Sequence, residues 1–140
     1  MTQEEKDLLL KDLSARLPYG VIVNVKGFDY DYNDKLTQIY KGVGCSIQVT
    51  TNMPYDIEQV KPYLFPMSSM TDEQREELKR EYCNIACDNI KKMFANPDES
   101  HLYSSKSSSF EIDYFNKHHI DYRGLIPKDL AIDATGLNIY

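Results

Sequence analysis

The sequence has no tryptophan, three cysteines and no long apolar run. No stretch approaches the roughly 18 apolar residues that a membrane-spanning helix needs, so we expect no membrane partner. The first residues, Met1 to Asp7, are acidic where a secretory signal would be basic. An odd number of cysteines without an export signal is typical of reduced thiols, which predicts a cytoplasmic protein.

Basic residues are outnumbered by acidic ones, with 16 Lys and Arg against 22 Asp and Glu and a formal net charge of −6. Proteins that hold nucleic acid electrostatically need clustered positive charge to displace counterions. The charge balance therefore argues against nucleic acid as a partner, unless the fold gathers a local basic patch.

Tyrosine is the residue type present in excess, with 11 tyrosines against 5 phenylalanines in 140 residues. Its apolar ring and polar hydroxyl suit half-buried sheet faces and interfaces alike. A chain of this length suits one domain, and we expect residues 1–140 to form a single α+β domain.

Two capping boxes predict the main helices. Thr2 with Glu5 precedes leucines at helical spacing, which predicts a helix from about Gln3 to Leu17. Thr71 with Gln74 begins a longer apolar periodicity to about Phe94, and we expect that helix to pack on the sheet.

The remaining pattern predicts strands and a C-terminal helix. Alternating β-branched residues at Val21, Val23 and Val25 predict a strand with one buried face. The serine-rich residues 96–108 predict a flexible connection. Ser108 with Glu111 has the form of a third capping box, which predicts a short C-terminal helix from Ser108. The expected fold is an antiparallel sheet of about three to five strands with an N-terminal helix and these two others.

An apolar connection within residues 62–70 offers candidate partner-binding side chains at Tyr63, Phe65, Met67 and Met70. Exposed, they would form an adhesive surface for a protein partner. The alternative, which the composition favours, lays them over the sheet.

Metal ligands are poorly represented. Cys83 and Cys87 share a helix face, and His118 and His119 are conceivable further ligands, but zinc sites usually use the tighter CxxC spacing. Small buried cysteines are the favoured interpretation, and we expect no metal and no cofactor.

Phe115 to Pro127 holds the densest set of reactive side chains: His118, His119, Asp121, Tyr122 and Arg123. They supply a general base, a carboxylate, a hydroxyl and an anion clamp, as a small hydrolase or phosphate-ligand enzyme requires. Neighbouring residues point in different directions, however, and no nucleophile is identifiable. The favoured interpretation is a turn that ends a helix, with Gly124 at positive φ.

Three stretches carry a resemblance. They resemble segments of small uncharacterised proteins from gut Bacteroidales bacteria and their phages or mobile elements. The matching segments are Leu17 to Val21 (LPYGV), Lys61 to Thr71 (KPYLxPMSSMT) and Asn116 to Ile126 (HHxDYRGLI). This chain departs from that pattern at Phe65 and Ile120. The resemblance implies a phage or prophage setting and carries no activity or catalytic residue.

The leading functional hypothesis is a non-catalytic cytoplasmic interaction or regulatory module with a protein partner. A small hydrolase or phosphate-ligand enzyme using residues 118–123 is one alternative, and a nucleic-acid-associated phage protein is another. The sequence favours a non-enzyme and leaves homo-oligomerisation open.

Overall fold

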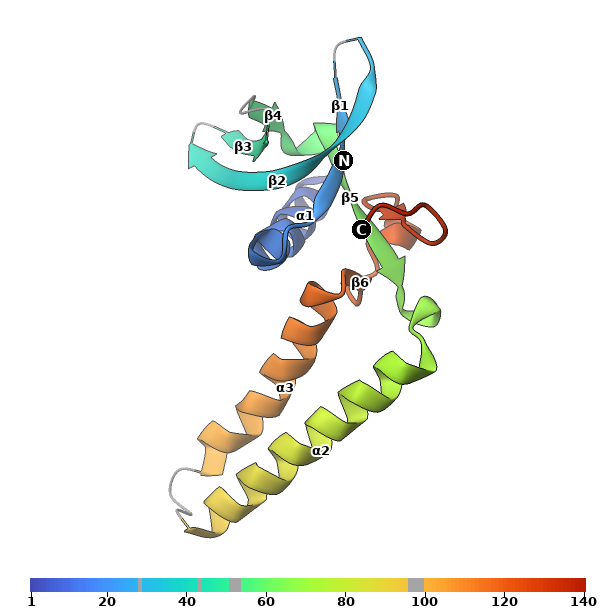
Figure 1. Cartoon of the computed structure of the whole chain (residues 1–140). Coiled ribbons are helices and arrows are strands. Elements are labelled where there is room, and N and C mark those ends of the chain that lie inside the picture. The colour runs from blue at the N-terminus through green and yellow to red at the C-terminus, as the bar shows by residue number, and fades with distance from the viewer. Residues whose placement is uncertain (28, 43, 51–53, 96–99) are drawn as a thin grey trace.

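The chain folds into a mixed sheet with one helix packed against it and a pair of helices that leaves it (Figure 1). The structure, a computed structural model, describes the backbone of residues 1–27, 29–42, 44–50, 54–95 and 100–140, and their side chains except those of 41–42, 44–46, 82, 85–95 and 100–108. The helices and strands are α1 Gln3–Arg16, β1 Ile22–Lys26, β2 Asp31–Gly42, β3 Gly44–Val49, β4 Pro54–Asp56, β5 Val60–Pro66, α2 Asp72–Ala95, α3 Ser100–Lys117, β6 Ile120–Asp121 and β7 Ile132–Asp133.

The sheet has seven strands among the described residues, in the order β4-β3-β2-β1-β5-β6, with β7 also paired to β5. The ladders from β4 to β5 are antiparallel, whereas β6 and β7 run parallel to β5. The α+β class is confirmed, but the expected antiparallel sheet of three to five strands is wrong. The two parallel strands span two residues each, too few to show alternation in the sequence.

The core lies on one face of this sheet, beneath α1. Val21, Val23 and Val25 are fully buried, as their alternation predicts. Leu9 and Leu13 of α1 pack into the same cluster. The Thr2–Glu5 capping box begins α1 as predicted, with both reciprocal hydrogen bonds formed.

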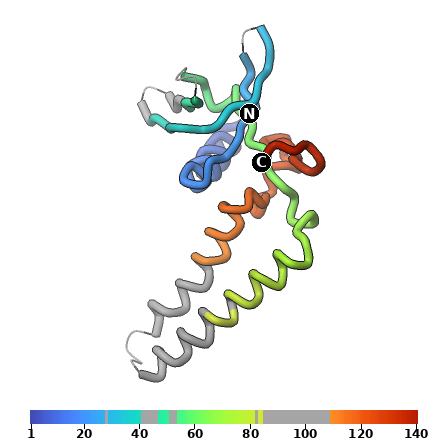
Figure 2. Tube along the Cα trace, viewed as in Figure 1, coloured from blue at the N-terminus to red at the C-terminus, as the bar shows by residue number. Residues whose placement is uncertain are grey.

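α2 and α3 pack on each other and run away from the sheet, and we call this pair the helical arm (Figure 2). The expectation that the long helix packs on the sheet is therefore wrong. A periodic apolar stripe predicts that a helix buries one face, but not which element covers that face. At the base of the arm, Met70, Tyr114 and Ile120 form a second buried cluster.

The C-terminal helix is also longer than expected. α3 begins at Ser100 and has 18 residues, so the serine-rich residues 100–108 are helical and Ser108 lies inside the helix rather than at its cap. Residues 96–99 of the expected connection lie outside the described residues. Helix propensities of serine are low, and the contact with α2 outweighs them here.

Among the described helices, none is long and apolar enough to cross a membrane.

Candidate functional site

The residues after α3 reverse the chain into the sheet. His119 has φ 55°, in the left-handed region, and its N–H donates to Asn116 O at 3.3 Å. Its own carbonyl accepts from Phe65 N at 2.8 Å, which begins the pairing of β6 with β5. A histidine thus occupies the helix-ending position that usually belongs to glycine. Gly124 has φ 70°, the positive value expected of it.

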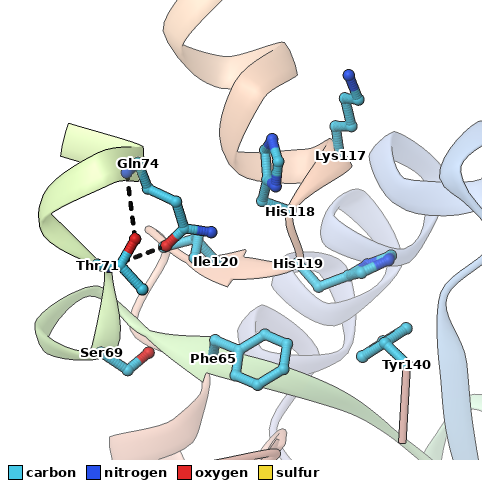
Figure 3. Close-up of a pocket in the computed structure, with 9 residues that line it drawn as sticks. All are labelled: Phe65, Ser69, Thr71, Gln74, Lys117, His118, His119, Ile120 and Tyr140. Atoms are coloured by element: carbon cyan, nitrogen blue, oxygen red, sulfur yellow. Dashed lines mark hydrogen bonds between the residues drawn. The ribbon is translucent and has the colours of Figure 1, made fainter. Parts of the chain in front are cut away.

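A pocket of about 430 Å³ opens at this reversal, between the base of the arm, the end of β5 and Tyr140 (Figure 3). Its lining comes from three stretches of the chain, residues 65–74, residues 117–120 and Tyr140. The lining residues are Phe65, Ser69, Thr71, Gln74, Lys117, His118, His119, Ile120 and Tyr140.

Both histidines of this pocket lie against tyrosine rings. The His118 ring centroid is 4.3 Å from that of Tyr114, and the His119 ring stacks on Tyr140 at 4.0 Å and 10°. Burial lowers the pKa of His118, and burial together with Arg16 lowers the pKa of His119 to about 4. Both imidazoles are therefore neutral at pH 7.

Tyr140 also bridges two strands. Its hydroxyl donates to Tyr63 O at 2.8 Å and accepts from Ile22 N at 3.3 Å, joining β1 to β5 beyond the end of their ladder. Burial raises the pKa of Tyr140 to about 12. Sequence reasoning missed this residue, because no local pattern connects position 140 with the strands that it bridges.

The Asp121 carboxylate is hydrogen-bonded to two backbone N–H groups. Its two carboxylate oxygens accept from Leu125 N and Ile126 N, each at 2.8 Å, and the residue is buried. A carboxylate that satisfies two backbone donors organises the turn after β6. It is therefore not free to orient a catalytic histidine.

Replacing Asp121 with alanine is expected to lower the free energy of unfolding by about 2–3 kcal/mol, because one buried and one half-buried backbone donor lose a charged acceptor. Asp121→Asn keeps one acceptor oxygen and should cost less. Equilibrium urea unfolding measures both. Asp133, whose carboxylate accepts from Thr135 N at an exposed site, is the matched control, and Asp133→Ala should cost less than about 1 kcal/mol. Equal losses at the two positions would contradict the assignment.

Arg16 and Asp12 of α1 form a buried ion pair next to this turn. Arg16 Nε and Nη2 donate to Asp12 Oδ2 and Oδ1 at 2.7 and 3.1 Å, and both side chains are fully buried. Arg16 also donates to Phe115 O at 3.3 Å and to Ile120 O at 2.8 Å. One guanidinium thus joins α1 to the end of α3 and to β6.

Arg123 joins the same carboxylate. Its Nε lies 3.2 Å from Asp12 Oδ1. The two groups form an ion pair, but Arg123 Nε makes no hydrogen bond. The guanidinium carbon of Arg123 lies 4.6 Å from the ring centroid of Tyr122, which stacks on Phe115 on another side. Arg123 is therefore part of the internal network and no clamp for an external anion.

Sequence reasoning missed Asp12 and Arg16, although a signal was present. Both positions fall on the apolar stripe that contains Leu9 and Leu13, with helical spacings of three and four residues. A charged pair four residues apart on the buried face of a helix predicts an internal ion pair.

The five candidate catalytic residues do not converge. Of them, His118 and His119 line the pocket, whereas Asp121, Tyr122 and Arg123 are held in the turn and the ion network.

The partner-binding candidates are divided between core and surface. Tyr63 and Met70 are buried, Phe65 lines the pocket, and Met67 is 44% exposed.

The metal-ligand candidates are not gathered. Cys83 is an exposed free thiol on α2, and the side chain of Cys87 lies outside the described residues. No group of three or more metal-ligating side chains occurs within the part of the chain that the structure describes.

Comparison of the chain with protein-family models, with curated proteins and with solved structures gives no match.

Proposed function

We propose that the protein is a non-catalytic interaction module whose helical arm carries the partner-binding surface. The observation that carries this proposal is the arm itself, since α2 and α3 leave the sheet and pack chiefly on each other. A helix pair that projects from a domain offers long side faces that the domain does not cover. The partner is a protein.

Exposed apolar side chains near the base of the arm support the proposal. Ile112 on α3 is 43% exposed, and Met67, just before α2, is 44% exposed. Apolar side chains at the surface of projecting helices are the usual anchors of helix-mediated recognition.

The alternatives receive less support from the geometry. The candidate catalytic side chains at residues 118–123 diverge, as described above. The first turn of α2 carries Asp72 and Glu73, which would repel a nucleic-acid backbone at the base of the arm.

The setting of the module is proposed from the resemblance of residues 17–21, 61–71 and 116–126 to phage and mobile-element proteins. A phage, prophage or mobile element would use such a module in the cytoplasm of its bacterial host. Its action there would be to bind a host or phage protein.

A photo-crosslinking comparison tests whether the helical arm binds a protein partner. Purified protein carrying p-benzoylphenylalanine at Ile112 is added to a lysate of the host and irradiated, beside protein carrying the same group at Tyr30. Tyr30 is 74% exposed, at the turn between β1 and β2, and so is a matched aromatic control away from the arm. We expect one discrete protein adduct from position 112 and none from position 30.

A competition experiment tests whether the adduct forms at a specific binding site. Unlabelled wild-type protein should suppress the adduct, and unlabelled Ile112→Glu protein should not, because a buried glutamate is costly at an apolar contact. Adducts of equal yield at both positions, or equal suppression by both competitors, would overturn the proposal.

A further inference from the structure

Aromatic rings form part of the wall of the pocket at the base of the arm. Four of its nine lining residues carry one: Phe65, His118, His119 and Tyr140 (Figure 3). The Phe65 and Tyr140 ring centroids are 5.9 Å apart, and the His119 ring stacks on the Tyr140 ring. Flat walls of this kind recognise a flat ring, which stacks on them or meets their edges.

The electrostatic character of the pocket is opposite to that of the whole chain. The protein has a net charge of −6, yet none of the nine lining residues is acidic and Lys117 is the charged one among them. The two histidines are neutral at pH 7 because their pKa values are lowered. Glu77 is not among the lining residues, and its carboxylate accepts a hydrogen bond from the Tyr114 hydroxyl at 3.0 Å. The pocket therefore favours an anionic group beside Lys117.

Gln74 adds a polar group with a defined orientation. Its Oε1 accepts from Thr71 N at 3.0 Å, which turns the amide nitrogen toward the side of His118 (Figure 3). That nitrogen can donate to an acceptor on a ligand. The start of α2 itself makes no anion site, because the capping box satisfies the backbone donors of Thr71 and Gln74, and Asp72 and Glu73 place negative charge in its first turn.

We propose that this pocket binds a small planar aromatic anion. The ring lies against Phe65 and Tyr140, and a ring or side-group acceptor accepts a hydrogen bond from the Gln74 amide nitrogen. Lys117 is exposed and points away from both rings in Figure 3, so its flexible side chain has to turn toward the pocket to pair with the anionic group. A volume of about 430 Å³ is within the range of small-molecule sites and suits an indole carboxylate or a nucleoside monophosphate. This binding is independent of the partner proposed for the arm, so either proposal can fail without the other.

Pairs of probes that share a ring and differ in charge test the proposal. Indole-3-acetate is compared with tryptamine, and adenosine monophosphate with adenosine, by titration of ¹⁵N-labelled protein followed by amide chemical shifts. Inorganic phosphate supplies the anion without the ring. We expect at least one anionic ring compound to bind with a dissociation constant of about 1 mM or lower and to shift the amides of Phe65 and His119. Its uncharged or cationic analogue should bind about tenfold more weakly, and phosphate should not shift these amides.

Two variants complete the test. Lys117→Gln should weaken the binding of the anionic probe about tenfold. It should leave the unfolding midpoint unchanged, since Lys117 is exposed at the end of α3. Lys128→Gln, at an exposed site outside this pocket, should change nothing. Equal binding of tryptamine and indole-3-acetate, no binding by any ring compound, or an unchanged affinity in Lys117→Gln would overturn the proposal. The relative affinities of the two anionic probes separate a carboxylate ligand from a phosphate ligand.

Discussion

Replacing Asp12 with asparagine is expected to lower the free energy of unfolding by about 3–5 kcal/mol. Asparagine keeps the shape of the side chain but removes the single negative charge between two arginines. Arg16 is fully buried and the Arg123 side chain is 17% exposed, so neither charge is well solvated. Guanidinium does not lose its proton near neutral pH, so the repulsion persists. Equilibrium urea unfolding followed by far-ultraviolet circular dichroism measures the loss.

A double-mutant cycle separates the ion pair from its surroundings. Arg16→Met should cost a similar amount, because Asp12 loses its bidentate partner and the carbonyls of Phe115 and Ile120 lose a donor. Asp12→Leu completes the cycle as the second single change, and Asp12→Leu combined with Arg16→Met removes both buried charges together. Its cost should be smaller than the sum of the single changes by at least about 1 kcal/mol.

An exposed pair provides the control. Lys79 and Glu76 of α2 lie 2.8 Å apart with about 70% of each side chain exposed, and Lys79→Met should change stability by less than about 0.5 kcal/mol. A cost below about 1 kcal/mol for Asp12→Asn would mean that the Asp12 site is open to water and would contradict the structure.

The same network positions the arm. Arg16 donates to Phe115 O in the last turn of α3 and to Ile120 O in β6, and it is held in place by Asp12 of its own helix. A cation at the carboxyl end of a helix also opposes the negative end of the helix dipole. The ion pair therefore connects the helix that covers the sheet with the base of the element to which we assign partner binding.

The sequence predicted the helix starts and the strand that depend on residues close together in the chain. The Thr2–Glu5 and Thr71–Gln74 capping boxes mark the starts of α1 and α2, because a cap is completed within four residues. The alternation at Val21, Val23 and Val25 marks a strand whose one face is buried, because side chains alternate between faces in any strand.

Long-range contacts decided the rest. The Ser108–Glu111 pattern resembles a cap, yet Ser108 is inside α3 because contact with α2 extends the helix to Ser100. The parallel pairing of β6 and β7 with β5 depends on segments 55 or more residues apart in the chain, where periodicity carries no information.

The candidate site shows the same division. Residues 118–123 were correctly expected to follow a helix end, since histidines and a later glycine suit that position. The pocket beside them also needs Phe65, Thr71, Gln74 and Tyr140, which two other parts of the chain supply. No sequence pattern joins these segments, so side-chain inventory alone suggested a catalytic group that the backbone does not assemble.

His119 should make the fold acid-sensitive between pH 6.5 and pH 4. Its pKa is about 4 in the folded protein, lowered from 6.5 by burial, by Arg16 and by His118. Within that interval the unfolded chain binds a proton that the folded protein does not. Stability is therefore complete above pH 6.5 and falls as the pH drops toward 4. The shift corresponds to a loss of about 2 kcal/mol between pH 7.5 and pH 5.

His119→Asn should remove this dependence. Asparagine tolerates the left-handed backbone of position 119 but carries no titrating group. The variant loses the stack on Tyr140 and is less stable at pH 7.5, yet its stability should change about 2 kcal/mol less than that of the wild type on acidification to pH 5. His118, Glu5, Glu58, Glu76 and Asp129 also have lowered pKa values and are present in both proteins, so their contributions cancel in the comparison. Parallel losses in the two proteins, or a His119 ring that titrates near pH 6.5 by NMR, would show that the imidazole is solvated and not buried against Tyr140.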